Sequence, residues 1–201
     1  MARIPSSDRR AMLIDAAITV IARHGVSGAT TRAIVAEAGM SLASFHYVFR
    51  SHAEMMRDVV AYVVDAEVAS VFQSLRLGSD IRQALRDGLQ AYLDYLIADP
   101  GHEQVMQELM HYALRTPGLE SLAAEQYEVY HAGVTSVLVE GAAVSLVEWT
   151  LPVDDVARLV ISFTDGVTLA WLADRDTAAA ERVLDFAADT LAALTRRREL
   201  A

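Results

Sequence analysis

The sequence contains no cysteine in its 201 residues. Disulfide bridges, cysteine-ligated zinc sites and thiol nucleophiles are therefore excluded. The first eight residues, Met-Ala-Arg-Ile-Pro-Ser-Ser-Asp, lack the apolar core of a signal peptide. The richest apolar stretch, residues 59–72, is interrupted by Asp65 and Glu67, and a membrane span needs about 18 uninterrupted apolar residues. Together these absences predict a soluble cytoplasmic protein that has no membrane partner.

Proline is also scarce, with four residues, at positions 5, 100, 117 and 152. Each lies between segments in which apolar residues recur every three or four positions, as on one face of a helix. No segment alternates convincingly between apolar and polar residues, so we expect no β-strand. The pattern predicts helices over residues 7–24, 32–38, 42–49, 52–75, 81–98, 102–115, 119–143, 152–174 and 177–197. About nine helices and no sheet make an all-α fold.

Capping residues mark the predicted helix ends near the N-terminus. They are Gly25 and Gly39 at C-termini, and Thr30 or Thr31, Ser41 and Ser51 at N-termini. Glu54 follows Ser51 by three residues, which predicts a reciprocal capping box at the start of the long fourth helix.

Charge is unevenly distributed along the chain. The net charge is -10 overall, but residues 1–52 hold six arginines against three acids, so this segment is +3 and the remainder is -13. A basic N-terminal segment on an acidic body is compatible with DNA binding, because phosphate attraction depends on the patch that faces the duplex.

Residues 30–55 carry the most informative motif. Two short predicted helices are separated by Gly39, Met40 and Ser41, which is the spacing of a helix-turn-helix. In the second helix Phe45 and Phe49 lie four residues apart and predict a buried face. Four residues are left to face outward, namely Leu42, Ser44, His46 and Tyr47. Such a helix suits base edges and phosphates in a major groove.

This motif resembles the helix-turn-helix of TetR-type regulators. The resemblance covers residues 30–41 and the signature Phe-His-Tyr-Val-Phe-Arg-Ser-His at residues 45–52, with looser similarity at residues 165–172. It implies a three-helix DNA-binding domain over residues 1–52 and a larger effector-binding and dimerisation domain over residues 53–201. It also implies a ligand-responsive transcriptional regulator, expected to act as a repressor.

The resemblance implies the DNA-contacting residues by position. These are Thr31, Arg32, Ser41, Leu42, Ser44, His46, Tyr47, Arg50 and His52. His46 stands where the family commonly has a tyrosine, a role that Tyr47 is expected to take over. His52 stands where a phosphate-binding lysine is common, so we expect a weaker or pH-dependent contact there. An N-terminal arm along the duplex is expected from Arg3, Arg9 and Arg10.

The resemblance further implies a homodimer on a palindromic double-stranded operator, formed through the last two helices. A small apolar or amphipathic effector would bind among the fourth to eighth helices. Its candidate contacts are Met and aromatic side chains with one leucine: Tyr92, Leu96, Met106, Met110, Tyr127, Tyr130, Phe163 and Trp171. The effector would shift the population of dimers away from the state in which the two DNA-binding domains lie about 34–36 Å apart and fit successive major grooves.

Two other functions compete with this interpretation. Glu108-x-x-His111 and Glu128-x-x-His131 have the spacing of di-iron helical bundles, but both pairs fall on polar helix faces, whereas metal ligands must point inward. A helical protein-interaction module without DNA binding is the other alternative. No serine–histidine–acid set or phosphate loop indicates an enzyme, and we expect no cofactor and no metal.

Overall fold

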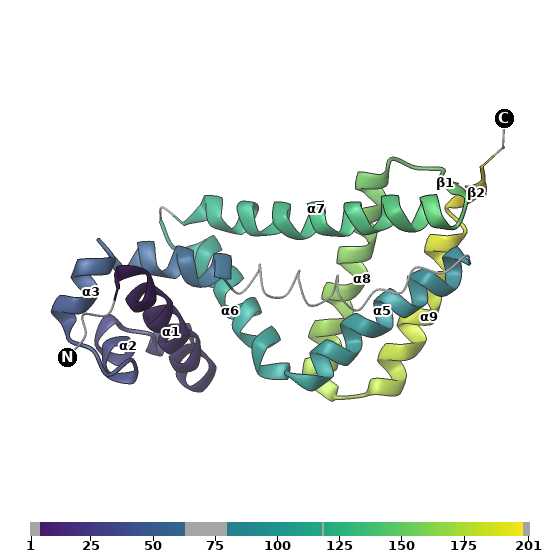
Figure 1. Cartoon of the computed structure of the whole chain (residues 1–201). Helices are drawn as coiled ribbons and strands as arrows, with labels where there is room; N and C mark the ends of the chain where they lie inside the picture. Colours follow the sequence, from purple (N-terminus) through teal and green to yellow (C-terminus); the bar gives the residue numbers. More distant parts are fainter. Residues whose placement is uncertain (1–4, 63–79, 118, 199–201) are drawn as a thin grey trace. The chain divides into compact units, whose positions relative to one another are not determined.

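The structure is a computed structural model that describes residues 5–62, 80–117 and 119–198 (Figure 1). It divides into two compact units. Unit 1 comprises Met1–Asp65 and Gly101–Gln126, and unit 2 comprises Ala66–Pro100 and Tyr127–Ala201. The domain boundary predicted after residue 52 stays a prediction, and the predicted fourth helix is described only over residues 52–62.

Unit 1 contains α1 (Ser6–Gly28), α2 (Thr31–Glu37), α3 (Leu42–Val48), a helix over residues 52–62, and α6 (Pro100–Arg115), with the start of α7. The apolar stripe predicted for α1 is buried, including Leu13, Ala17 and Val20. The stripe packs against α2 and α3, so periodicity alone identified the inner face of this unit.

Three predicted caps are confirmed in unit 1. Side-chain oxygens of Thr30, Ser41 and Ser51 accept hydrogen bonds from backbone N–H groups three residues on. The second half of the capping box differs, because Glu54 Oε2 accepts the N–H of Arg50, at 2.9 Å, in place of that of Ser51. The carboxylate therefore reaches back into the turn after α3.

Gly25 interrupts α1 where the sequence predicts the end of the helix. Its φ of 70° and ψ of 171° are non-helical, and a further turn continues to Gly28. This backbone conformation is open mainly to glycine. It aims the N–H of Val26 at α6, where Glu108 Oε2 accepts it at 2.7 Å. A Cβ on Gly25 would lie 3.0 Å from the same oxygen. The helix break thus creates a contact between segments 82 residues apart.

Unit 2 contains α5 (Ile81–Ala98), most of α7 (Glu120–Val144), β1 (Val147–Trp149), α8 (Val153–Asp174), α9 (Thr177–Ala192) and β2 (Thr195–Arg197). Helices α5, α8 and α9 pack against one another (Figure 1). Their shared core consists of Leu89, Leu93, Leu96, Val167, Trp171, Ala180, Leu184, Ala187 and Ala188.

The expectation that the chain has no strand was wrong. β1 and β2 form a two-stranded antiparallel sheet in which Glu148 pairs with Arg196. The ninth helix accordingly ends at Ala192 and not near Arg197, and Asp176 is its N-cap. Three-residue strands are too short to show periodicity, and their pairing depends on residues 48 positions apart, so local sequence patterns carry no signal for them.

Among the described residues, α8 is long and apolar enough to cross a membrane by length and composition. Its most apolar 18-residue window has mean hydropathy 1.4 and is 33% buried within the chain. The sequence criterion of uninterrupted apolar residues therefore overlooked this helix. α8 packs one face against α5 and α9, and two thirds of this window is not buried within the chain.

Candidate nucleic-acid interface

The turn between α2 and α3 is fixed by backbone geometry. Gly39 adopts a φ of 63°, and the N–H of Met40 donates to the carbonyl of Val35 at 2.8 Å. The turn holds two short helices of seven residues each at the spacing predicted for a helix-turn-helix. Local chemistry, a glycine followed by a capping serine, therefore builds this motif.

The two faces of α3 differ sharply. Phe45 and Phe49 are each 1% exposed, with ring centroids 5.5 Å apart. On the opposite face Leu42 is 43% exposed, Tyr47 is 61% exposed, and His46 is also exposed. Aromatic burial thus anchors the helix while apolar and polar groups remain available to a ligand.

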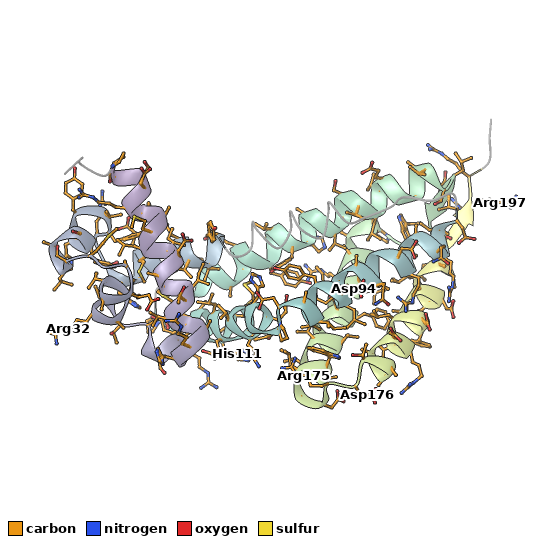
Figure 2. All side chains as sticks on the ribbon, turned by 60° about the horizontal axis from the view of Figure 1, so that its bottom comes forward. Arg32, Asp94, His111, Arg175, Asp176 and Arg197 are labelled. Carbon is orange, nitrogen blue, oxygen red and sulfur yellow. The ribbon has the colours of Figure 1, made fainter. Side chains whose placement is uncertain are left out.

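The remaining predicted DNA contacts surround this face. Ser41 is exposed at the start of α3, and Ser44 is half-buried and bonded to it through both its N–H and its hydroxyl. Thr31 is half-buried at the first position of α2, next to the exposed Arg32. Figure 2 shows Arg32 on the outside of α2 with its side chain directed away from the ribbon.

The C-terminal end of α3 is followed by Arg50 and His52. Arg50 is exposed, whereas His52 is half-buried and places Nε2 2.7 Å from the carbonyl oxygen of Ala29. Since a carbonyl only accepts, the ring nitrogen donates in this bond. His52 therefore links the helix over residues 52–62 to the loop between α1 and α2.

The expected arginine arm is not one structural group. Arg3 lies outside the described residues, and the guanidinium of Arg9 lies over the ring of Tyr47, 5.6 Å from its centroid. Arg10, whose side chain is 38% exposed, instead donates to Asp58 and to the carbonyl of Val48. The expectation that Arg10 belongs to an arm along the duplex stays a prediction, and the sequence does not show the protein groups that face this arginine.

Electrostatics at this turn follow from the same contacts. The backbone N–H of Arg50 holds the pKa of Glu54 below its ordinary value of 4.5, and Arg10 adds to the effect. Hydrogen bonding to Asp58 raises the pKa of Arg10, so the guanidinium stays charged. The turn after α3 is therefore held by ionised groups.

The structure divides the predicted effector contacts. Met106 and Met110 belong to unit 1, and the other six residues belong to unit 2. Leu96 and Trp171 are buried in the core of α5, α8 and α9, with Phe163 packed against it. The Tyr92 hydroxyl bonds that of Thr168, which is fully buried.

Tyr127 and Tyr130 are both half-buried on α7. Tyr127 stacks on His131 and lies under the guanidinium of Arg158, 5.4 Å from its carbon. Tyr127 is thus packed into a polar contact between α7 and α8. The pocket assignment as a whole stays a prediction.

The two Glu-x-x-His pairs make other contacts. Glu108 accepts from Val26, and His111 Nδ1 lies 2.8 Å from the carbonyl of Gln107 in its own helix. His131 bonds the carbonyl of Asp154, and Glu128 is exposed. Within residues 5–62, 80–117 and 119–198, no group of three His, Asp or Glu side chains is placed to hold a metal.

Comparison with known proteins gives consistent results for both parts of the chain. The family described as "Bacterial regulatory proteins, tetR family" matches residues 13–59. The family described as "BetI-type transcriptional repressor, C-terminal" matches residues 81–196.

Individual relatives agree with these matches. The nicotine-responsive transcriptional repressor HdnoR of Paenarthrobacter nicotinovorans is 32% identical over 172 residues, covering 86% of this chain and 88% of that protein. The transcriptional activator FasR of Mycolicibacterium smegmatis is 34% identical over 97 residues, covering 48% of this chain and 44% of FasR. The crystal structure of the multidrug binding protein EbrR with ethidium has a TM-score of 0.72 at 25% identity, covering 92% of this chain and 98% of EbrR.

The helix-turn-helix, the all-α fold and these matches agree along the chain. The protein therefore belongs to the TetR family and is a ligand-responsive, DNA-binding transcriptional regulator.

Proposed function

We propose that this regulator binds a palindromic operator as a homodimer in the cytoplasm and represses transcription until a small apolar or amphipathic effector releases it. The observation that carries the DNA-binding part is the division of α3 into a buried aromatic face and an exposed face. A helix anchored in this way enters a major groove as a rigid element.

The exposed groups take different roles in this proposal. Leu42, Ser44 and His46 read base edges, whereas Thr31, Ser41, Tyr47 and Arg50 hold phosphates, and Arg32 reaches either. A neutral imidazole has one donor, and His52 already uses it on the Ala29 carbonyl. A phosphate contact by His52 therefore requires the protonated ring.

An exposed apolar surface on α8 and α9 supports the homodimer. Leu169 is 55% exposed, Val183 is 43% exposed and Phe186 is 64% exposed. Beside them, a groove of about 190 Å³ between the two helices is lined mainly by apolar side chains, including Phe163 and Trp171. Figure 2 places Arg175 and Asp176 at the turn that joins these helices. A second copy covering this surface would give a two-fold interface of four helices.

The core of unit 2 supports the proposed effector class. The bonded hydroxyls of Tyr92 and Thr168 lie beside a core that includes Leu96 and Trp171. A polar handle within apolar surroundings suits an amphipathic molecule. HdnoR is named for its response to nicotine, and EbrR was solved with ethidium, and both compounds are small ring systems that contain nitrogen. We therefore propose a ligand of this size and polarity. It acts by binding more tightly to the dimer in which the two DNA-binding domains are spaced so that they do not fit the operator.

The first test is selection of random duplex DNA by the purified, refolded protein, since refolding removes a ligand bound during expression. We expect enrichment of a palindrome whose affinity falls steeply with salt. Tyr47→Ala should weaken binding to all sequences, whereas Ser44→Ala or His46→Ala should change the preferred sequence. No enrichment by folded, dimeric protein would contradict DNA binding and favour an interaction module.

The second test addresses regulation, with the enriched palindrome placed at a promoter in a purified transcription reaction. Added protein should reduce the transcript, and nicotine serves as the first effector probe, followed by other small ring amines. An increase in transcript on adding the protein alone would contradict repression. Release by no compound, with repression intact, would contradict the effector class.

A further inference from the structure

Two consecutive arginines on α1 contact the C-terminal end of α3 from different sides. The guanidinium of Arg9 lies over the ring of Tyr47, a residue that is 61% exposed. The guanidinium of Arg10 lies over the buried ring of Phe49, 4.5 Å from its centroid. Both arginines are half-buried, but Arg9 lies over an exposed ring and Arg10 over a buried one.

Arg10 joins three separate segments. Its Nη1 donates to the carbonyl of Val48 at 3.2 Å, in the last residue of α3. Its Nε donates to Asp58, and its Nη2 lies 3.5 Å from Glu54 Oε1, both in the helix over residues 52–62. One guanidinium thus connects α1, the end of α3 and the helix that follows it.

The network holds the peptide groups on both sides of Phe49. The Val48 carbonyl accepts from Arg10, and the Arg50 N–H donates to Glu54, which itself contacts Arg10. The ring between these two groups is 1% exposed. The backbone of the turn is therefore fixed before, at and after Phe49.

We propose that Arg10 is a positioning residue for DNA recognition, which sets the orientation of α3 through the turn at Phe49 and does not contact DNA itself. The proposal rests on the proposed DNA-contacting face of α3. Two carboxylates already neutralise the guanidinium, so little charge is left for phosphate. A lysine cannot replace this arrangement, since an ammonium lacks the planar set of donors that reaches several acceptors at once.

Salt dependence separates positioning from contact. Arg10→Gln, which removes the charge, should weaken binding to the selected palindrome by about tenfold, as for loss of one base contact, and leave the slope of log affinity against log salt unchanged. The matched control Arg9→Gln should reduce that slope by about one, as loss of a phosphate contact does. Preference for the palindrome over random duplex should fall for Arg10→Gln and stay constant for Arg9→Gln.

Replacing an acidic residue gives a second test, because its charge alone and its contact with Arg10 predict opposite changes in DNA affinity. Asp58→Asn deletes a negative charge, which by charge alone strengthens binding to DNA. Loss of the Arg10 contact should instead weaken binding and lower sequence preference. Asp15→Asn, an exposed acid of α1, is the control and should bind as tightly as the unmodified protein or more tightly.

The outcomes decide between the two roles. A slope that falls by about one in Arg10→Gln would make Arg10 a phosphate contact, and unchanged affinity in both Arg10→Gln and Asp58→Asn would leave it without a role. Thermal unfolding confirms that each variant is folded at the assay temperature. If Asp58→Asn does not fold, Glu54→Gln tests in the same way whether removal of an acid weakens or strengthens DNA binding. Binding by the unmodified protein shows separately that the proposed function holds.

Discussion

The turn after α3 and the contact between α5 and α9 are stabilised in different ways. At the turn, charged side chains bond backbone groups of other segments, as Arg10 does with the Val48 carbonyl and Glu54 with the Arg50 N–H. Between α5 and α9 the ion pairs join side chains only, as in Arg82–Asp189 and Arg86–Asp185. Backbone contacts fix the position of a segment, whereas paired flexible side chains tolerate sliding. Of the two contacts, the turn beside the proposed DNA-reading helix is held through its backbone by charged side chains, whereas α5 and α9 are held mainly by their shared apolar core.

The largest effect is expected from the core beneath the reading face. Phe45→Ala removes a side chain that is 1% exposed and should lower the free energy of unfolding of unit 1 by about 3–5 kcal/mol. Leu42→Ala, on the exposed face of the same helix, should change it by less than about 0.5 kcal/mol. Denaturant unfolding measures both, and equal effects would contradict the assignment of the two faces.

The second prediction concerns the apolar surface of unit 2. Phe186→Asp should weaken dimerisation by about 2 kcal/mol or more, because the exposed ring would be a central interface contact. Leu114→Asp is the matched control, since Leu114 is 60% exposed on α6 and Phe186 is 64% exposed on α9. Sedimentation should show a monomer for Phe186→Asp alone. A stable dimer in that variant would place the interface elsewhere.

A smaller effect is expected at the contact between α1 and α6. Glu108→Ala should cost about 1 kcal/mol of unfolding free energy and speed hydrogen exchange of the Val26 amide, whose bond it removes. Glu108→Gln keeps an acceptor and should recover most of the protection. Arg82→Ala breaks an exposed pair between side chains and should leave stability within measurement error. Equal losses in Glu108→Ala and Arg82→Ala would remove the contrast between backbone and side-chain contacts.

The smallest effect is a pH dependence of the turn. Because the folded-state pKa of Glu54 lies below its ordinary 4.5, its contribution to stability is complete above that value and is lost as pH falls through the folded-state pKa. The melting temperature should therefore decrease on acidification below about pH 4.5, and Glu54→Gln should show a smaller decrease. Parallel melting curves against pH for the two proteins would show that Glu54 contributes nothing.

Much of the fold could be predicted because its signals are local. Ser41 and Gly39 set the boundaries of α2 and α3 by their own chemistry, and the predicted bounds of α5 agree with the structure. The exposure of Leu42, His46 and Tyr47 on α3 was likewise predictable, since it follows from burial of Phe45 and Phe49, whereas Ser44 of the predicted outward set is half-buried.

What the sequence could not supply depends on distant partners. Arg10 and Glu108 have the sequence context of ordinary surface charges, and their roles follow only from Val48 and Val26, which lie 38 and 82 residues away. For the same reason the sequence does not distinguish Arg10, which bonds the backbone of another segment, from its neighbour Arg9, which lies over the ring of Tyr47. Periodicity identifies which face of a helix is buried, and it does not identify the group that a polar side chain will meet.

The hydrogen bond from Val26 to Glu108 has a consequence for the range over which this regulator can respond. A bond at this exposed site contributes about 1 kcal/mol, and each 1.4 kcal/mol is a factor of ten. A signal that passed from α6 to α1 through this bond alone would therefore change operator affinity by about fivefold at most. A wider response would require a second route between them, so the dynamic range of the regulator measures how many such contacts act together.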